Sequence, residues 1–210
     1  VKYQQAHEAG KFQDEIVPVP VSQRKADPIL FEKDEHPRLS PVEILSTLRP
    51  AFRENGTVTA GNSSGINDGA AAALLVNEEV LKELDIEPVV RVVSMAIAGV
   101  TPDCMGVGPV PATQKALKRA GLRVSDLDLV ELNEAFASQV IACMRDLDLN
   151  PEIVNVNGGS IAIGHPLGAS GTRISATLLH EMQKRENVRY GLATMCIGVG
   201  QGAAIIYEKM

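Results

Sequence analysis

The sequence predicts an α/β protein in which helices alternate with buried strands in layers. Two observations support this fold class. From residue 87 onward, runs of apolar and β-branched residues alternate with segments whose apolar residues recur every three or four positions. Glycine-rich turns separate many of these segments, as is typical of connections between strands and helices. The 210 residues, of which 45% are hydrophobic, suffice for one ordinary core or two small ones.

Residues 1–55 are polar and rich in proline, and no amphipathic pattern persists in them. We therefore interpret them as an excursion from a core, with short pieces such as residues 15–19 pairing as strands. The chain begins with Val1 in polar, helix-like sequence, so we expect it to start within a longer protein.

Residues 56–86 combine a predicted strand at 57–59 with a turn of small residues at 61–69. An apolar run follows at residues 70–76. Asn77 is then predicted to cap a helix that continues to Leu84, because an asparagine side chain can accept a hydrogen bond from the first helical N–H groups.

The remaining residues carry the clearest alternation of strand and helix patterns. Helices are predicted at residues 111–120 and 135–147 and after Gly168, and strands at residues 89–98, 127–132, 153–156, 190–195 and 203–208. Pro111 suits a helix start, and Gly121 suits a helix end. In the last helix, Ile174, Leu178 and Met182 share one face.

Composition excludes several function classes. The net charge is −6, aromatic residues make up 3%, and Trp is absent, which argues against binding to nucleic acid or to an anionic membrane surface. No apolar run approaches the roughly 20 residues that a membrane span needs. The three widely spaced cysteines suggest neither a disulfide framework nor a metal site, so we expect reduced thiols in a cytosol-like compartment.

The first candidate segment for chemistry is the small-residue turn at residues 61–65. It fits the Gly-x-Ser-x-Gly pattern of a hydrolase nucleophile elbow, which would make Ser63 a nucleophile. Residues 66–69, however, are poor helix openers, whereas the elbow needs a helix directly after the serine. A tight turn that needs glycine backbone freedom is therefore the favoured reading.

Three further segments place reactive side chains at strand or helix ends. Asn133 follows a predicted strand, where it either caps a helix or points into a crevice at the strand end. His165 lies within a glycine-rich stretch just before a helix start, where developing negative charge is favoured. Cys196 ends a strand among glycines, and the alternative there is an inert buried thiol.

Together these segments resemble the thiolase family, which comprises acetyl-CoA acetyltransferases and 3-ketoacyl-CoA thiolases. The matching stretches occur in the family's order from near residue 10 to the end of the chain, and they are residues 14–18, 56–69, 105–111, 133–136, 158–171 and 196–198. Several ordered motifs are far more specific than one glycine-rich loop.

The resemblance implies a layered αβαβα fold with two similar halves and a loop domain. Residues 1–55 then correspond to the end of the loop domain, residues 56–86 to the last part of the N-terminal half, and residues 87–210 to the C-terminal domain. The family's nucleophilic cysteine lies upstream of these residues. Neither Cys104 nor Cys143 occupies a matching motif.

The resemblance also implies roles for four residues. His165 activates the nucleophilic thiol, and its Nε2 helps to stabilise the thioester oxyanion. Asn133 orients a water in the same oxyanion hole. Cys196 removes the α-proton of the second acetyl-CoA or returns it in thiolysis, and the backbone N–H of Gly198 lies in a second oxyanion hole. These residue types suit the chemistry. The pKa of a thiol, about 8.5, can be shifted by its surroundings. Because the α-proton is only weakly acidic, the enolate oxygen needs hydrogen-bond donors that are already in place.

Contacts to coenzyme A are implied by the same matching. Ser64 and Ala60 resemble pantetheine contacts, Ala135 and Phe136 line its tunnel, and Met105 shapes a small acyl pocket. Arg38 is the candidate for the nucleotide end.

We therefore expect the full-length protein to condense two acetyl-CoA molecules or to cleave 3-ketoacyl-CoA. Coenzyme A thioesters are then substrates, and no resident cofactor is expected. We expect a cytoplasmic homodimer or homotetramer, or a protein of the mitochondrial or peroxisomal matrix in a eukaryote. The chain alone is expected to be inactive because it lacks the nucleophile. The alternative is a non-catalytic thiolase-like module that binds acyl-CoA.

Overall fold

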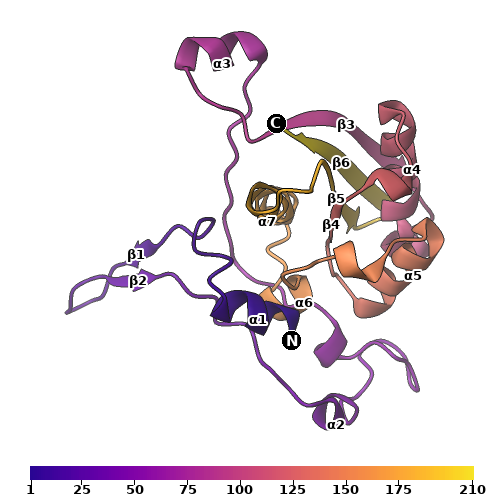
Figure 1. Cartoon of the computed structure of the whole chain (residues 1–210). Coiled ribbons are helices and arrows are strands. Elements are labelled where there is room, and N and C mark those ends of the chain that lie inside the picture. The colour runs from indigo at the N-terminus through magenta and orange to yellow at the C-terminus, as the bar shows by residue number, and fades with distance from the viewer.

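A four-stranded mixed sheet forms the centre of the computed structural model, which describes residues 1–210 (Figure 1). Its strand order is β3-β6-β5-β4, formed by β3 (Val90–Gly99), β4 (Leu129–Leu132), β5 (Tyr190–Ile197) and β6 (Gln201–Lys209). The pairs β3–β6 and β5–β6 are antiparallel, whereas β4 and β5 run parallel. The parallel pair needs a crossover, and the intervening helices supply it.

Helices cover both faces of this sheet. The helices α4 (Pro109–Ala120) and α5 (Ala137–Leu147) lie on one face, and α7 (Ser170–Lys184) lies on the other (Figure 1). This arrangement confirms the predicted layered α/β class. None of the helices combines the length and apolar composition that crossing a bilayer requires.

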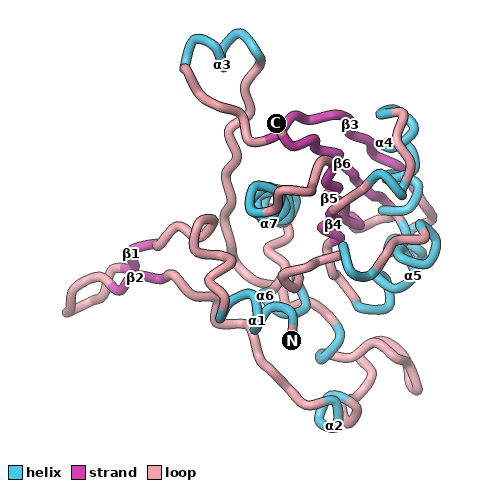
Figure 2. Tube along the Cα trace, in the orientation of Figure 1, coloured by secondary structure: helices cyan, strands magenta, loops and turns pink.

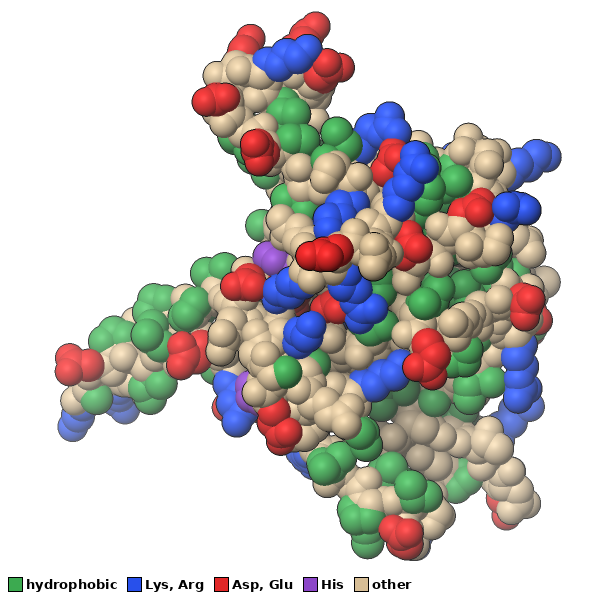
Figure 3. All heavy atoms as spheres, in the orientation of Figure 1, with side chains coloured by type: hydrophobic (Ala, Val, Ile, Leu, Met, Phe, Trp, Pro, Cys, Tyr) green, Lys and Arg blue, Asp and Glu red, His purple; other side chains and the backbone are tan.

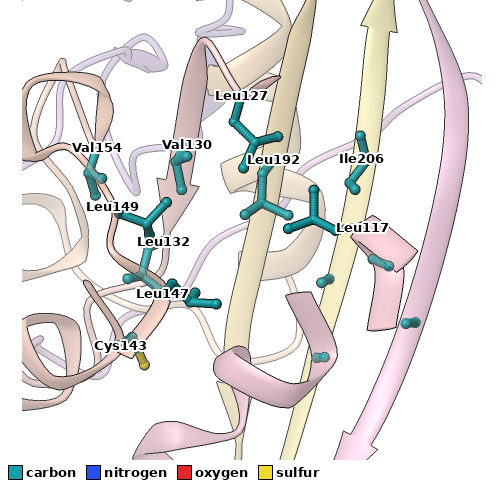
Figure 4. Close-up of a cluster of buried hydrophobic side chains, with 14 of the residues drawn as sticks. Leu117, Leu127, Val130, Leu132, Cys143, Leu147, Leu149, Val154, Leu192 and Ile206 are labelled. Carbon is teal, nitrogen blue, oxygen red and sulfur yellow. The ribbon is translucent and has the colours of Figure 1, made fainter. Parts of the chain in front are cut away.

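The two faces have separate cores because neighbouring strand residues point in opposite directions. On β5, Leu192 belongs to the larger cluster beneath α4 and α5, which Figure 4 shows, while Ala193 belongs to a smaller cluster beneath α7. The α7 side of the smaller cluster is made by Ile174, Leu178 and Met182, as their helical spacing predicted.

Residues 1–86 are mostly loop (Figure 2). Their elements are short, and they are α1 (Lys2–Glu8), β1 (Val19–Val21), β2 (Ile29–Phe31), α2 (Val42–Leu45), a 3-10 turn (Ala60–Asn62) and α3 (Glu78–Leu84). The β1–β2 hairpin and α3 project away from the sheet (Figure 1). Apolar side chains cover much of the hairpin surface in Figure 3, and both strands are exposed along their whole length.

Several predicted elements are confirmed with small shifts. Asn77 caps α3 by accepting a hydrogen bond from the N–H of Val80. Gly121 ends α4 in the left-handed region at φ 69°. The helix α4 begins at Pro109 rather than Pro111, because the earlier proline already suits the first turn. The predicted strand at residues 15–19 was misplaced: the N–H of Glu15 closes a turn onto Phe12, and β1 starts at Val19.

Two predicted strands are wrong because asparagine side chains take over their hydrogen bonds. At residues 57–59, the Asn62 amide bonds to the Thr59 N–H and the Thr57 carbonyl, so the segment makes only one isolated bridge. At residues 153–156, the Asn155 side chain bonds to both the N–H and the carbonyl of Leu132, at 2.8 Å each. The backbone of this segment makes one parallel bridge with β4, between Val154 and Val130, and the Asn155 side chain replaces the next one.

Four further short stretches lie between these elements. They are 3-10 turns at Pro102–Val107, Val124–Asp126 and Pro151–Ile153, together with the short helix α6 (Ser160–Ile163). The helix α6 was not expected within the glycine-rich stretch. It ends at Gly164, whose φ of 98° favours glycine.

Candidate functional site

The glycine-rich turn that carries His165 is held between the end of β4 and a loop of the first region. Asn133 directly follows β4, and its N–H donates to the Thr194 carbonyl of β5 at 3.0 Å. On the other side, the His165 N–H donates to the Gly65 carbonyl at 2.8 Å, and Ile66 forms a parallel bridge with His165. Residues about 100 positions apart in sequence thus frame one imidazole.

His165 is 8% exposed, and both of its ring nitrogens have partners. The Nδ1 atom lies 2.6 Å from Ser170 Oγ, and the Nε2 atom lies 3.3 Å from Asn133 Nδ2. Burial, and secondarily the positive charge of Arg173, lowers the pKa of His165 below its ordinary value of 6.5. The imidazole is therefore neutral at neutral pH and can accept a proton.

Asn133 is not a helix cap, because α5 begins only after Phe136. Its side chain is buried, and its Oδ1 accepts a hydrogen bond from Ser160 Oγ at 2.6 Å. Ser160 in turn accepts from Arg173 Nη2 at 2.8 Å. Sequence reasoning gave no role to Ser160, although it lies in the matching stretch 158–171, and missed Arg173, which stands in no distinctive local pattern.

Glu134, the next residue, closes the backbone of the same turn. Its carboxylate accepts from the Ile161 N–H and from Asn155 Nδ2, both at 3.0 Å. An added Cβ at Gly159 would lie 2.5 Å from this carboxyl group, so only glycine fits there. Glu134 therefore holds the start of α6 in place.

Cys196 lies at the same end of the sheet as Asn133. It is two residues beyond Thr194, the strand partner of Asn133, and it pairs with Gly202 of β6. The adjoining segments also meet, because an added Cβ on Gly171 of α7 would lie 3.6 Å from Met195 Sδ. Burial raises the pKa of the Cys196 thiol, and a backbone hydrogen bond opposes that rise.

The turn after Cys196 is open around Gly198. An added Cβ on Gly198 would meet no atom within 4 Å. Val199 and Gly200 follow with φ of 69° and 89°, which turns the chain sharply into β6. Space is therefore free at Gly198, two residues after the buried thiol.

Three of the coenzyme A candidates are brought together. The N–H and the hydroxyl of Ser64 both donate to the Ala135 carbonyl, at 3.1 and 3.2 Å. Ser63 forms an antiparallel bridge with Phe136, whose ring packs edge-on against Phe52.

The remaining candidates lie further out. Ala60 is exposed in the 3-10 turn before Ser64, and Met105 is half-buried in the turn before α4. Arg38 is an exposed loop residue two positions after His36, whose ring lies against Gly65.

Ser63 lacks the setting of a hydrolase nucleophile. Its hydroxyl donates to the Thr59 carbonyl at 2.7 Å. It follows a 3-10 turn, and the next helix starts only at Glu78. The strand-turn-helix that a nucleophile elbow requires is absent, so the hydrolase alternative is wrong.

The other two cysteines are not placed for the same chemistry. Cys104 is exposed in the turn before α4. Cys143 is buried in α5 and donates to the Gly106 carbonyl at 3.2 Å, and burial raises its pKa to about 11. A thiol with that pKa is rarely ionised near neutral pH. No group of three or more His, Cys, Asp or Glu side chains is arranged to hold a metal ion.

One end of the mixed sheet carries a buried neutral imidazole, an oriented amide and a buried thiol. An α/β protein with this set of groups has the side chains that acid–base and acyl-transfer chemistry require. Comparison with known proteins makes the class specific. The model of the thiolase C-terminal domain matches residues 86–209, and that of the thiolase N-terminal domain matches residues 1–79. The chain belongs to the thiolase family, which confirms the resemblance seen in its motifs.

Relatives and solved structures agree with this assignment. The chain is 56% identical over 208 residues to an acetyl-CoA acetyltransferase of Syntrophomonas wolfei, covering 98% of this chain and 52% of the relative. It superposes on an acetyl-CoA acetyltransferase of Bacillus anthracis with a TM-score of 0.96 and 45% identity, over 100% of this chain and 53% of that one.

A third comparison is with human mitochondrial 3-ketoacyl-CoA thiolase in complex with CoA, at a TM-score of 0.90 and 42% identity. It covers 100% of this chain and 52% of that one. The expected thiolase-like layered fold is therefore confirmed. The chain spans about half the length of the curated relatives it matches.

Proposed function

We propose that the full-length protein is an acyltransferase that condenses two acetyl-CoA molecules to acetoacetyl-CoA and catalyses the reverse thiolysis of 3-ketoacyl-CoA. One observation carries the proposal: the neutral His165 contacts Asn133 at the end of the sheet where Cys196 also lies. The names of the similar proteins, acetyl-CoA acetyltransferase and 3-ketoacyl-CoA thiolase, support the substrate class.

In the first half-reaction, His165 takes the proton of a nucleophilic thiol supplied from outside residues 1–210. The thiolate attacks the thioester carbonyl, and coenzyme A leaves as its thiol, so the acyl group becomes covalently bound. Nε2 of His165, once protonated, and a water held by Asn133 stabilise the oxyanion. The lowered pKa of His165 supports its role as base at neutral pH.

In the second half-reaction, Cys196 removes the α-proton of a second acetyl-CoA. The backbone N–H of Gly198 stabilises the enolate oxygen, and the enolate carbon attacks the acyl thioester and expels the nucleophilic thiolate. Because burial raises the pKa of Cys196, its thiol must first lose its proton, and the resulting thiolate is then a base strong enough for a weakly acidic α-proton. The open space at Gly198 supports the approach of a substrate.

Coenzyme A is proposed to enter along the seam between Ser64 and the Ala135–Phe136 backbone. Ala60 would extend this path, Met105 would limit the acyl group to small chains, and Arg38 would lie toward the nucleotide end. The hydrogen bonds between Ser64 and Ala135 hold the two walls of the path together. The chemistry requires no resident cofactor.

The upstream part of the same protein is the proposed partner of this chain. Relatives about twice as long support this, as does an apolar hollow of about 510 Å³ beside α7, lined by residues including Met95, Ile97 and Ile205. We further propose a cytoplasmic homodimer or homotetramer, or a protein of the mitochondrial or peroxisomal matrix in a eukaryote. The proposed division is a loop-domain end at 1–55, an N-terminal-half end at 56–86 and a C-terminal domain at 87–210.

Replacing Cys196 by Ala in the full-length protein tests the assignment. Condensation should be lost, whereas acyl-enzyme formation, followed as coenzyme A release or as a mass increase of the protein, should persist. Cys104→Ala is the matched control, because that thiol is exposed and outside the site. Undiminished acetoacetyl-CoA synthesis by the Cys196→Ala enzyme would contradict the proposal.

A further inference from the structure

A line of buried side chains leads away from His165 and joins three separate segments. Asn133 Nδ2 lies 3.3 Å from His165 Nε2, Ser160 Oγ lies 2.6 Å from Asn133 Oδ1, and Arg173 Nη2 lies 2.8 Å from Ser160 Oγ. Asn133 follows β4, Ser160 begins α6, and Arg173 belongs to α7. The side chains of Asn133 and Ser160 are essentially excluded from solvent.

Arg173, at the end of the line farthest from His165, determines the direction of each hydrogen bond in it. A guanidinium can only donate, so Ser160 Oγ accepts from Arg173 and directs its own proton to Asn133. The Asn133 atom that receives this proton must be the oxygen. The amide nitrogen therefore faces His165 and donates, so Nε2 of His165 must be the acceptor.

The other side of the imidazole is compatible with the same tautomer. Ser170 Oγ donates to the Pro166 carbonyl at 3.1 Å. With that proton so placed, the Ser170 oxygen, 2.6 Å from His165 Nδ1, accepts from the ring N–H. Because the Ser170 hydroxyl can also rotate and donate to Nδ1, Ser170 follows the tautomer that Asn133 sets and does not fix it by itself.

The guanidinium of Arg173 is committed to this line. Its Nε and Nη1 atoms are buried without hydrogen-bond partners, and the nearest carboxylate oxygen, on Glu131, is 4.0 Å from Nη1. The hydrogen bond to Ser160 is therefore the one that orients the group. If the Asn133 amide turned over, its oxygen would face His165 and would favour a proton on Nε2, which blocks the proposed base.

We propose that Ser160 and Arg173 are positioning residues that hold His165 in the tautomer protonated on Nδ1, so that Nε2 carries no proton and can exchange the Asn133 hydrogen bond for the thiol proton. This inference rests on the proposed function, because it specifies how that base is kept ready. Neither residue touches the substrate; both act through Asn133.

The test uses the full-length protein labelled with ¹⁵N-histidine, in which nitrogen chemical shifts report the tautomer of His165. The wild type should show a proton on Nδ1. Ser160→Ala should give a mixture of both tautomers, and kcat should fall about fivefold to tenfold, while KM stays within about twofold. Arg173→Lys, which keeps a donor and a charge, should retain the Nδ1 proton and most of kcat.

Ser175→Ala is the matched control. Like Ser160, Ser175 is a buried serine, but it lies in α7. Its hydroxyl donates to the Gly171 carbonyl and accepts from Tyr207, away from His165. The Ser175→Ala variant should lose about as much stability as Ser160→Ala but keep the wild-type tautomer of His165 and the wild-type kcat. Equal losses of kcat in Ser160→Ala and Ser175→Ala, with an unchanged His165 tautomer in both, would overturn the inference.

If Ser160→Ala does not fold, the wild-type spectrum still shows which nitrogen of His165 carries the proton. A proton on Nε2 in an active enzyme overturns the positioning role and leaves the thiolase function intact. A proton on Nδ1 in a protein without thiolase activity overturns the proposed function and leaves the tautomer assignment standing.

Discussion

Residues 87–210 and residues 1–86 contain similar apolar runs but bury them very differently. Leu178 and Leu192, in α7 and β5, are almost fully buried, whereas Leu30, Leu74 and Leu75 are more than half exposed. The strand β5 has helices over both faces, while the run at residues 70–76 lies along an extended segment with none. Apolar content alone therefore does not locate a core; a covering layer is also needed.

The first region nevertheless contributes to the site at two points. Gly65 and Ile66 hold His165 through backbone contacts. Tyr3 of α1 lies against Gly158, at the start of the glycine-rich stretch that carries His165. Residues 87–210 thus form the core, and residues 1–86 support the turn that carries His165.

The largest expected effect is on the reaction rate and concerns His165, which lies in residues 87–210. His165→Asn in the full-length protein should lower the rate of acetoacetyl-CoA thiolysis about 10³-fold, because a general base is removed. His7→Asn in α1 is the control and should stay within about twofold of the wild type. A His165→Asn enzyme within tenfold of the wild type would place the base elsewhere.

Next in size is the difference in core burial. Leu178→Ala should reduce the unfolding free energy by about 3 kcal/mol, because it leaves a cavity beneath α7. Leu30→Ala, at a position 59% exposed on the hairpin, should cost less than about 0.5 kcal/mol. Urea unfolding of the full-length variants measures both. Equal losses would mean that the hairpin leucine is covered in the full-length protein.

A smaller effect tests the bracing of the turn. Gly158 has φ of 85°, and an added Cβ would lie 2.8 Å from the Tyr3 backbone nitrogen, so Gly158→Ala should cost about 2 kcal/mol. Gly168→Ala, in the same glycine-rich stretch but beyond α6, meets no atom within 4 Å and should change stability by less than about 1 kcal/mol. Thermal unfolding compares the pair, and indistinguishable melting temperatures would refute the bracing.

The smallest effect concerns Glu131, buried on β4. Burial raises its pKa from 4.5 to about 8, against the opposing charge of Arg173. Because the folded-state pKa is the higher one, this group stabilises the fold at low pH and loses that contribution as pH rises through about 8. Glu131→Gln should therefore match the wild type within about 1 kcal/mol at about pH 4, where the carboxyl is protonated in both the folded and the unfolded protein.

The same variant should lose less stability than the wild type between about pH 6 and about pH 9, since glutamine has no proton to release. Melting temperatures at the two pH values give the comparison. Parallel declines of the two proteins would show that Glu131 does not titrate in this window.

Local pattern was enough for the regular elements. The helices α4, α5 and α7 were predicted to within about two residues because helical periodicity and glycine or proline signals act between near neighbours. The strands at 57–59 and 153–156 were mispredicted, because the side chains of Asn62 and Asn155 satisfied backbone groups that a strand would have paired. Such competition is decided by where the side chain lands, which residue type alone does not reveal.

The α/β class, the glycine-rich turns, the thiolase family and the candidates His165, Asn133 and Cys196 could all be read from local sequence. The orientation of these side chains could not, because it depends on Ser160 and Arg173, which bond to groups 27 and 13 positions away. The difference is one of range. Backbone preferences are set by adjacent residues, whereas the direction of a buried hydrogen bond depends on segments that meet only when the sheet and its helices close.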